Sequence, residues 1–302
     1  MGLPRNESVA AMRKRTRAFW FFTVLLAAAF VRPLWELLQL TLNFQGIHSH
    51  ILLVPLVSAY LFKTTATPFH AGTKPNSWIA ASLVALLGIL FVGAYWFLKQ
   101  NGTIAAVDGT ALLIAGFLLE MFAGALAIFG WPALKSRLFA ISFLVFMIPL
   151  PTPAFEFASL ALQRASADVA EVMLRATGMP VLRDGMMMHL PNLRIIVAEE
   201  CSGIRSTFVL FMTSLIASNL FLRTGWKRAL LVLAILPIAI LRNAFRITTI
   251  AWLTVNVNPN IIHSPLHHRG GPVFFVLSLA PLFLLLWLLR KSEKQRRVMD
   301  SR

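Results

Sequence analysis

Long apolar runs recur along the chain and are separated by short polar segments. A helix needs about 20 consecutive apolar residues to cross the hydrocarbon core of a bilayer. The second and fifth runs are short and contain or adjoin prolines, so broken helices and a total of seven or nine spans are also open. The pattern predicts eight membrane-spanning helices, at roughly 18–41, 49–63, 78–98, 110–130, 137–151, 203–222, 229–252 and 272–290.

The longest segment between two runs, 152–200, has a different pattern. From about 155 to 177, apolar residues recur at helical spacing opposite charged ones, which predicts a short amphipathic helix lying in the membrane interface. Two turn signals, Asp184-Gly185 and Pro191-Asn192, then separate short apolar stretches, as in a small hairpin. The predicted apolar face of the helix consists of Phe157, Leu160, Ala161, Val169, Val172 and Met173.

Composition agrees with a membrane protein. The 302 residues are 58% hydrophobic and 13% charged, with a mean hydropathy of +0.73, whereas soluble domains hold about 45 to 50% apolar and about 25% charged residues. No internal repeat or linker interrupts the pattern. We therefore predict an all-α polytopic integral membrane protein that forms a single domain over residues 1–302.

The net charge of +16 comes from basic residues that cluster beside the apolar runs. Such clusters are typical of loops that stay in the cytoplasm, and they do not form a polar surface suited to nucleic acid. The pattern predicts cytoplasmic tails at 1–17 and 291–302 and a periplasmic, interfacial segment at 152–200. It indicates a multi-pass membrane protein, in contact with membrane lipid and without a nucleic-acid partner.

Cys201 is the only cysteine, which excludes an intrachain disulfide and any site with several cysteine ligands. It lies in the polar sequence EECSGIRS, at the predicted start of the sixth span. The positive end of a helix dipole favours a thiolate, so this position suits a nucleophile. Glu199 and Glu200 oppose that effect and call for a compensating cation. The alternative is a small buried residue without a chemical role.

Arg242, Asn243 and Arg246 lie inside the predicted seventh span. An arginine in a membrane helix costs about 2.5 to 3.5 kcal/mol on insertion scales, so it usually faces a polar interior and serves a function. Positions 242 and 246 are four residues apart and share one helix face. The alternative is an arginine that extends to the outer headgroups.

Three histidines, His263, His267 and His268, and Arg269 precede the last span. A histidine can exchange protons near neutral pH. No acidic residue or cysteine lies beside them, so we predict neither a metal site nor a cofactor. Solvated loop histidines are the alternative. The predicted topology brings Cys201, Arg246 and His267 to the same membrane face.

At these residues the chain resembles the exosortase/archaeosortase family. The cysteine block at 197–206 is the most specific of the matching elements. The elements follow in order: His48-Ser49-His50 with Leu53-Val54-Pro55, Phe146 to Pro151, Arg183-Asp184-Gly185, the block 197–206, Asn243 to Arg246, and His267 followed by Gly271 and Phe275.

The resemblance implies a cysteine protease or transpeptidase embedded in a bacterial inner membrane, which cleaves exported proteins at a C-terminal Pro-Glu-Pro (PEP-CTERM) sorting signal. It implies catalytic roles for Cys201 as nucleophile, His267 as acid and base, and Arg246 as a cation that stabilises the oxyanion or thiolate. His268 and Arg269 stay open as alternatives to His267. The candidates for support or substrate binding are Arg205, Arg242, Asn243, His268, Arg269 and Glu200.

Two other classes of function are weighed against this reading. A transporter or export scaffold could bind an anionic substrate through Arg242 and Arg246, and a membrane acyltransferase could work through histidine. Neither needs Cys201. The target proteins, the scissile bond, the choice between hydrolysis and transfer, and the oligomeric state are left open by the sequence.

Overall fold

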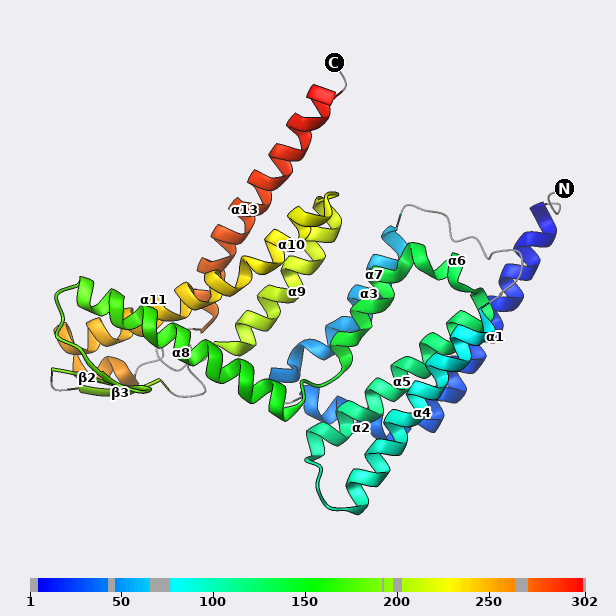
Figure 1. Ribbon diagram of the computed structural model, residues 1–302, viewed down its shortest axis with the longest axis horizontal. Coiled ribbons are helices and arrows are strands. Elements are labelled where there is room, and N and C mark those ends of the chain that lie inside the picture. The colour runs from blue at the N-terminus through cyan, green and yellow to red at the C-terminus, as the bar shows by residue number, and fades with distance from the viewer. Residues whose placement is uncertain are drawn as a thin grey trace. The chain divides into compact units, whose positions relative to one another are not determined.

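Figure 1 shows the computed structural model, which describes residues 5–42, 47–65, 77–191, 193–197, 203–263 and 271–300. Its contacts divide the chain into two compact units, an N-terminal unit, Met1–Ala154, and a C-terminal unit, Phe155–Arg302. Each unit is described by itself, and the single domain expected over 1–302 stays a prediction.

The described part of the N-terminal unit is helical. Long helices alternate there with short helical turns near prolines and charged residues. The elements are α1 Arg5–Ala29, α2 Val31–Leu42, η1 Ile47–Leu53, α3 Val54–Thr64, α4 Trp78–Gln100, α5 Ala106–Phe129, α6 Trp131–Leu134, η2 Lys135–Arg137, α7 Leu138–Ser142 and η3 Phe143–Met147.

The predicted first span is broken, because α1 and α2 are bent by 76° about Phe30. Pro33 lies in the first turn of α2 and has no N–H to donate to the carbonyl of Ala29. A proline is tolerated in a first helical turn but cannot continue the preceding helix, which explains a break at this position.

Helix α5 is the centre of the N-terminal unit and packs against both α4 and α1. Small residues allow the close approach. A Cβ atom on Gly116 would come within 3.0 Å of Val92 on α4, and one on Gly124 would overlap the ring of Phe22 on α1. Close backbone approach at glycine is a common way to pack membrane helices, which have no hydrophobic drive to associate in lipid.

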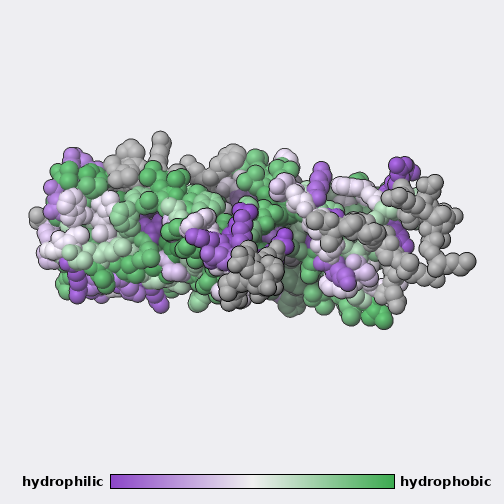
Figure 2. Space-filling view, turned by 90° about the horizontal axis from the view of Figure 1, so that it is seen from above, coloured by the Kyte–Doolittle hydropathy of each residue, from purple (hydrophilic) through white to green (hydrophobic). Residues whose placement is uncertain are grey.

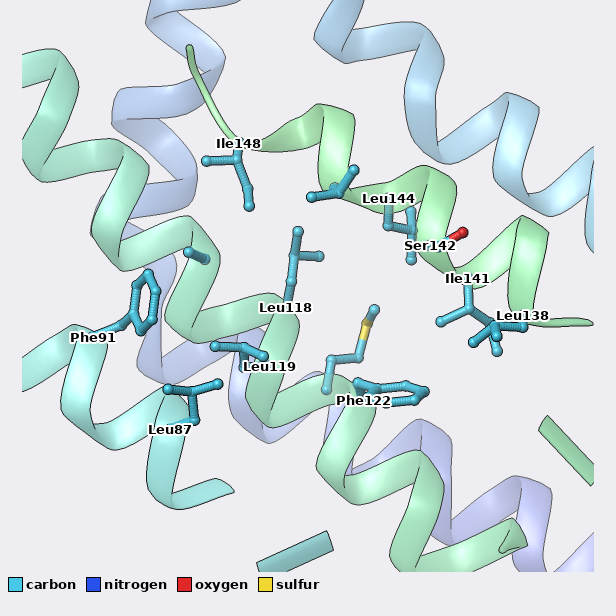
Figure 3. A pocket seen from close by; sticks show the side chains of 13 residues that line it. Leu87, Phe91, Leu118, Leu119, Phe122, Leu138, Ile141, Ser142, Leu144 and Ile148 are labelled. Carbon is cyan, nitrogen blue, oxygen red and sulfur yellow. The ribbon is translucent and has the colours of Figure 1, made fainter. Parts of the chain in front are cut away.

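An apolar pocket of about 380 Å³ lies between α4 and α5 on one side and α7 and η3 on the other (Figure 3). Its polar lining residue is Ser142, whose hydroxyl donates to the carbonyl of Phe139 at 3.1 Å. The pocket therefore presents hydrocarbon almost throughout and suits no polar ligand.

The C-terminal unit combines a small sheet with a helical bundle. Helix α8 begins in the last residues of the N-terminal unit and continues into this one. The elements are α8 Thr152–Ala176, β1 Leu182–Asp184, β2 Met187–Leu190, β3 Leu193–Ile196, α9 Ile204–Phe221, α10 Gly225–Leu233, α11 Ile235–Asn256, η5 Pro259–His263 and α13 Gly271–Asp300.

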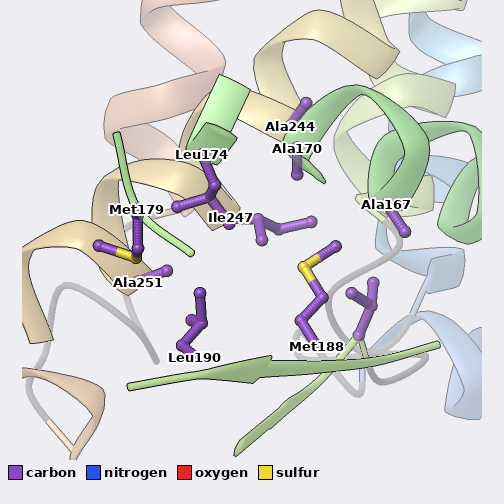
Figure 4. Close-up of a cluster of buried hydrophobic side chains, with 10 residues drawn as sticks. Ala167, Ala170, Leu174, Met179, Met188, Leu190, Ala244, Ile247 and Ala251 are labelled. Atoms are coloured by element: carbon purple, nitrogen blue, oxygen red, sulfur yellow. The ribbon is translucent and has the colours of Figure 1, made fainter. Parts of the chain in front are cut away.

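The three strands form an antiparallel sheet in the order β1-β2-β3, which extends the predicted hairpin by one strand. Gly185, with φ +59°, supplies the left-handed conformation in the first turn. One face of the sheet packs on α8 and α11, with Met188 and Leu190 directed into their side chains (Figure 4). This core holds the sheet against the helix that carries Arg242 and Arg246.

Helix α8 occupies almost the range predicted for the interfacial helix, and three residues of the predicted apolar face lie outside the protein core. Phe157, Leu160 and Val172 are exposed. The protein core is reached by small or polar side chains together with two leucines, which recur every three or four residues. They are Ser159, Leu162, Gln163, Ser166, Ala167, Ala170 and Leu174. The interfacial position of α8 stays a prediction.

The bundle of the C-terminal unit joins α9, α10, α11 and α13 through apolar side chains such as Leu210, Leu231 and Leu282. At one end, the carboxylate of Glu293 on α13 accepts from the backbone N–H groups of Arg223 and Thr224, at 3.1 and 2.9 Å. It thereby satisfies free N–H groups in the turn before α10.

Five helices are long and apolar enough to cross a membrane, or up to seven if each of two bent pairs counts as one span, among the residues described. Large hydrophobic side chains cover much of the face shown in Figure 2. The chain is therefore an all-α, multi-pass membrane protein, as predicted, but the count of eight is only approximate. The predicted second span, 49–63, contains the 11-residue helix α3, which is much shorter than the about 20 residues that a span needs.

Candidate active site

The described part of the site begins at Gly203, directly before α9. Its φ of +68° lies in the left-handed region, which glycine adopts without steric cost. The Gly203 carbonyl accepts from the N–H and the hydroxyl of Thr207, both at 2.9 Å, and from the hydroxyl of Ser206 at 3.2 Å. Cys201 precedes Gly203 by two residues and, with Glu200, lies outside the described part of the chain.

Arg242 joins α11 to the beginning of α9. Its Nη2 donates to the Gly203 carbonyl at 3.1 Å and to the Thr207 hydroxyl at 3.3 Å. The side chain is 8% exposed, and the neighbouring Asn243 is 2% exposed. A Cβ atom on Gly203 would lie 2.6 Å from Nη2 of Arg242 and 3.3 Å from Oδ1 of Asn243. Glycine at 203 therefore permits both the backbone turn and the close approach of α11.

The second guanidinium nitrogen of Arg242, Nη1, is buried and has no hydrogen-bond partner among the described residues. A buried charge is costly unless it is paired and hydrogen-bonded. Arg246 lies one turn further along α11 and is half-buried, whereas Arg205, in the first turn of α9, is exposed. Arg242 and Asn243 are thus brought to the start of α9, while Arg205 is directed towards the surface.

The other predicted site residues, His267, His268 and Arg269, lie in the segment 264–270, outside the described residues. Among the residues that the structure does describe, no three or more His, Cys, Asp or Glu side chains come together as metal ligands. The described geometry is that of a hydrogen-bonding cluster, made of backbone, hydroxyl and guanidinium groups.

Sequence reasoning did not single out Ser206 or Thr207. Their position, at the end of the cysteine block and before an apolar run, is the signal that could have identified them, because serine and threonine at a helix start often bond to the backbone. The hydroxyl of Thr207 both donates to Gly203 and accepts from Arg242, and so links the two helices.

Arg183 fixes the sheet to α8. Its guanidinium pairs with Asp168 and with Glu171, and its Nε donates to the Gly185 carbonyl at 2.7 Å. The Arg183 side chain is mostly buried, and three acceptors hold its planar donors in one orientation. The sheet, whose last strand leads towards Cys201, is therefore tied to α8 through β1 by charge as well as by the apolar core.

In the N-terminal unit, His48 and His50 lie on η1 and are half-buried. Burial lowers the pKa of His48 below its ordinary value of 6.5, and the nearby His50 lowers that pKa further. The lowered pKa of His48 favours its neutral form more strongly than in a solvated histidine.

Comparison with known proteins gives one finding. The family model for transmembrane exosortases matches residues 43–284, which is well over half of the chain. No curated protein and no solved structure matches the chain. The match includes α9 and α11 with the Gly203–Arg242 contact, and the spans of the fold agree with a transmembrane family. The chain therefore belongs to the transmembrane exosortase family.

Proposed function

We propose that the protein is a membrane-embedded cysteine protease or transpeptidase of the PEP-CTERM sorting system, which cleaves exported proteins near a C-terminal sorting signal. Family membership supports a membrane protein of this system. The observation that carries the proposal further is the bond from Arg242 to the carbonyl of Gly203, two residues after Cys201. It brings a buried cation to the start of the helix that follows the only thiol of the chain.

Cys201 is the proposed nucleophile. Its thiolate forms a bond to the carbonyl carbon of the scissile peptide, the C–N bond breaks, and the leaving amine takes a proton from His267. Water or an acceptor amine then gives a proton back to His267 and attacks the thioester. The C–S bond breaks, and the thiolate is restored. No oxidant, metal or cofactor enters this balance.

The arginines of α11 are proposed to supply the positive charge. Arg246 stabilises the oxyanion or the thiolate, because a fixed cation in a poorly hydrated site acts more strongly than in water. Arg242 orients the residues around Gly203. The remaining candidates, Arg205, Asn243, His268, Arg269 and Glu200, are proposed as support or as substrate contacts.

The test is Cys201→Ser, assayed by cleavage of a co-expressed substrate at matched membrane abundance. Serine keeps the shape but is a poor nucleophile without a strong base, so cleavage should be lost. A thiol-blocking reagent should inhibit the wild type, in which Cys201 is the only possible target. Cleavage retained at more than about a tenth of the wild-type rate would exclude the covalent mechanism, because loss of a nucleophile costs many powers of ten.

The same variant separates the proposal from the two other classes of function. A transporter or scaffold that binds an anion through Arg242 and Arg246, and an acyltransferase that works through histidine, should both keep their activity in Cys201→Ser. The active site is proposed to lie on the periplasmic side of the inner membrane.

A further inference from the structure

Strand β3 has a neighbour on one side only within the described sheet. The order β1-β2-β3 places it at an edge, with β2 beside it in antiparallel register. Edge strands carry backbone groups that can bond to another extended chain. The register shows which backbone groups of β3 are available.

The N–H of Val197 donates to the carbonyl of Met186 at 3.0 Å. In an antiparallel ladder, hydrogen-bonded and non-hydrogen-bonded pairs alternate. Counting back from Val197, Ile195 and Leu193 also bond to β2, whereas Arg194 and Ile196 form the non-bonded pairs. The N–H and C=O groups of Arg194 and Ile196 therefore point away from β2, towards the open edge.

The side chains of the same two residues are exposed, while those of Leu193 and Ile195 pack against the core. Ile196 is 59% exposed. The opposite face is fixed by Met188 and by the Arg183 contacts with α8. An extended chain that pairs with β3 would therefore meet a strand that is already ordered, which lowers the entropic cost of binding.

The chain connects this edge directly to the proposed nucleophile. After Ile196 come the buried Val197 and then the block that holds Cys201, five residues beyond the end of the strand. A peptide aligned along β3 would therefore be held close in sequence to the residue that is to attack it. Proteins commonly bind extended peptides by adding a strand to a sheet edge, where backbone bonds supply affinity.

We propose that the open edge of β3 binds an extended segment of the exported protein as an added antiparallel strand, with an acidic substrate side chain opposite Arg194. This rests on the proposed function. A substrate residue opposite Arg194 exchanges two backbone hydrogen bonds with it, and their side chains stand on the same face as a cross-strand pair. A carboxylate there would meet the exposed guanidinium of Arg194, which forms no ion pair among the described residues.

The geometry also sets what may flank the acidic residue. Successive residues of a strand direct their N–H groups to opposite edges, so both neighbours of the acidic residue point away from β3. Proline, which has no N–H, is accepted in a strand where that side faces outward. A Pro-Glu-Pro segment places an acidic residue opposite Arg194 and residues without an N–H on either side of it. Its glutamate can form both backbone bonds with Arg194, and the missing N–H groups of the two prolines face away from β3.

The test measures binding and cleavage of a synthetic peptide with a Pro-Glu-Pro segment by the purified full-length protein. In Arg194→Glu both should fall by about tenfold, because a favourable cross-strand charge pair becomes a repulsive one. A Pro-Lys-Pro peptide should recover them in that variant. Lys99→Glu, which makes the same charge change at an exposed site at the end of α4, is the matched control and should bind as the wild type does.

A second peptide tests the backbone bonds. N-methylation of the backbone amide of the peptide's glutamate removes the N–H that is proposed to bond to β3, and it should abolish binding. Alanine in place of either proline of the peptide should have little effect. Equal losses in Arg194→Glu and Lys99→Glu, no recovery with the lysine peptide, or tolerance of the methylated glutamate would each overturn the strand-addition proposal. A different result would separate the two proposals. If Arg194→Glu loses the glutamate peptide and recovers binding with the lysine peptide, but Cys201→Ser still cleaves, then strand addition at β3 stands and the proposed cysteine mechanism fails.

Discussion

At the scale of single residues, Arg242 shows what spacing in the sequence can and cannot predict. The four-residue interval to Arg246 places both arginines on one face of α11. It does not tell which of the two arginines contacts the start of α9. The bond from Arg242 to Gly203 joins residues 39 positions apart, and it depends on how two helices pack. The sequence alone likewise gives no reason for glycine at 203. The reason becomes clear in the structure, where a side chain at 203 would overlap the guanidinium of Arg242.

We predict that Arg246→Lys loses most of its cleavage rate and that Arg242→Lys is milder. Lysine at 242 keeps the charge and one donor for Gly203 or Thr207, whereas an oxyanion or thiolate at Arg246 needs the directed, planar donors of arginine. Arg242→Met should be more damaging than Arg242→Lys, because it leaves a buried contact without its donor. The measurement is cleavage of one reporter at matched membrane abundance. If Arg242→Lys is the inactive variant and Arg246→Lys is not, the two roles are reversed.

His48 gives a prediction on pH. Because burial lowers its pKa below 6.5, the unfolded chain binds the proton more readily than the folded chain does. Stability should be complete above pH 6.5 and should decline as the pH falls through and below that value. Thermal unfolding of the wild type and of His48→Gln, compared at pH 5 and pH 8, should show a smaller pH effect in the variant. An equal pH effect in both proteins would contradict this assignment.

At the scale of elements, the apolar pattern of the sequence predicts where helices form but not which of their faces pack in the protein core. The extent of α8 agrees within a few residues, but the core side carries alanine and serine while Phe157 and Val172 are exposed. In a membrane protein, large apolar side chains can face lipid, and small residues let helices and sheets approach closely. Hydrophobicity alone therefore does not show which side of such a helix packs against the protein. The sheet was easier to predict, because its glycine and proline turns are local signals.

The two faces of α8 can be distinguished by one substitution made twice. Ala167 is 0% exposed, whereas Ala161 is exposed on the same helix. Ala167→Leu should destabilise the protein by about 1 to 3 kcal/mol, because added methylenes do not fit a packed core. Ala161→Leu should leave stability nearly unchanged. Thermal unfolding of the purified variants is the measurement, and equal stabilities would mean that the alanine face of α8 is not packed as described.

At the scale of the whole molecule, the number of spans decides on which sides the chain ends lie. Five or seven spans place the two termini on opposite faces of the membrane, whereas eight place them on the same face. The run 49–63, which the sequence marks as short and open to being a broken span, contains a helix of only 11 residues. The distribution of basic residues still predicts that both tails are cytoplasmic.

Reporter fusions test this topology. A reporter after Asn260 should behave as exported, and one after Thr224, in the basic turn between α9 and α10, should behave as cytoplasmic. Fusions at the two termini should both report the cytoplasm. A cytoplasmic result after Asn260 would separate His267 from Cys201 and remove the proposed site. Opposite results at the two termini would instead show an odd number of spans.

The contact of α1 with α5 has a consequence for how sequences related to this chain can change. Because the ring of Phe22 lies directly over Gly124, neither position can change freely while the other stays the same. A side chain at 124 requires a smaller residue, or a displaced ring, at 22. Among related sequences the two positions should therefore covary, with alanine or serine at 124 accompanied by a smaller residue at 22. Covariation of positions 22 and 124 would then show that close packing of α1 against α5 has been maintained among these sequences.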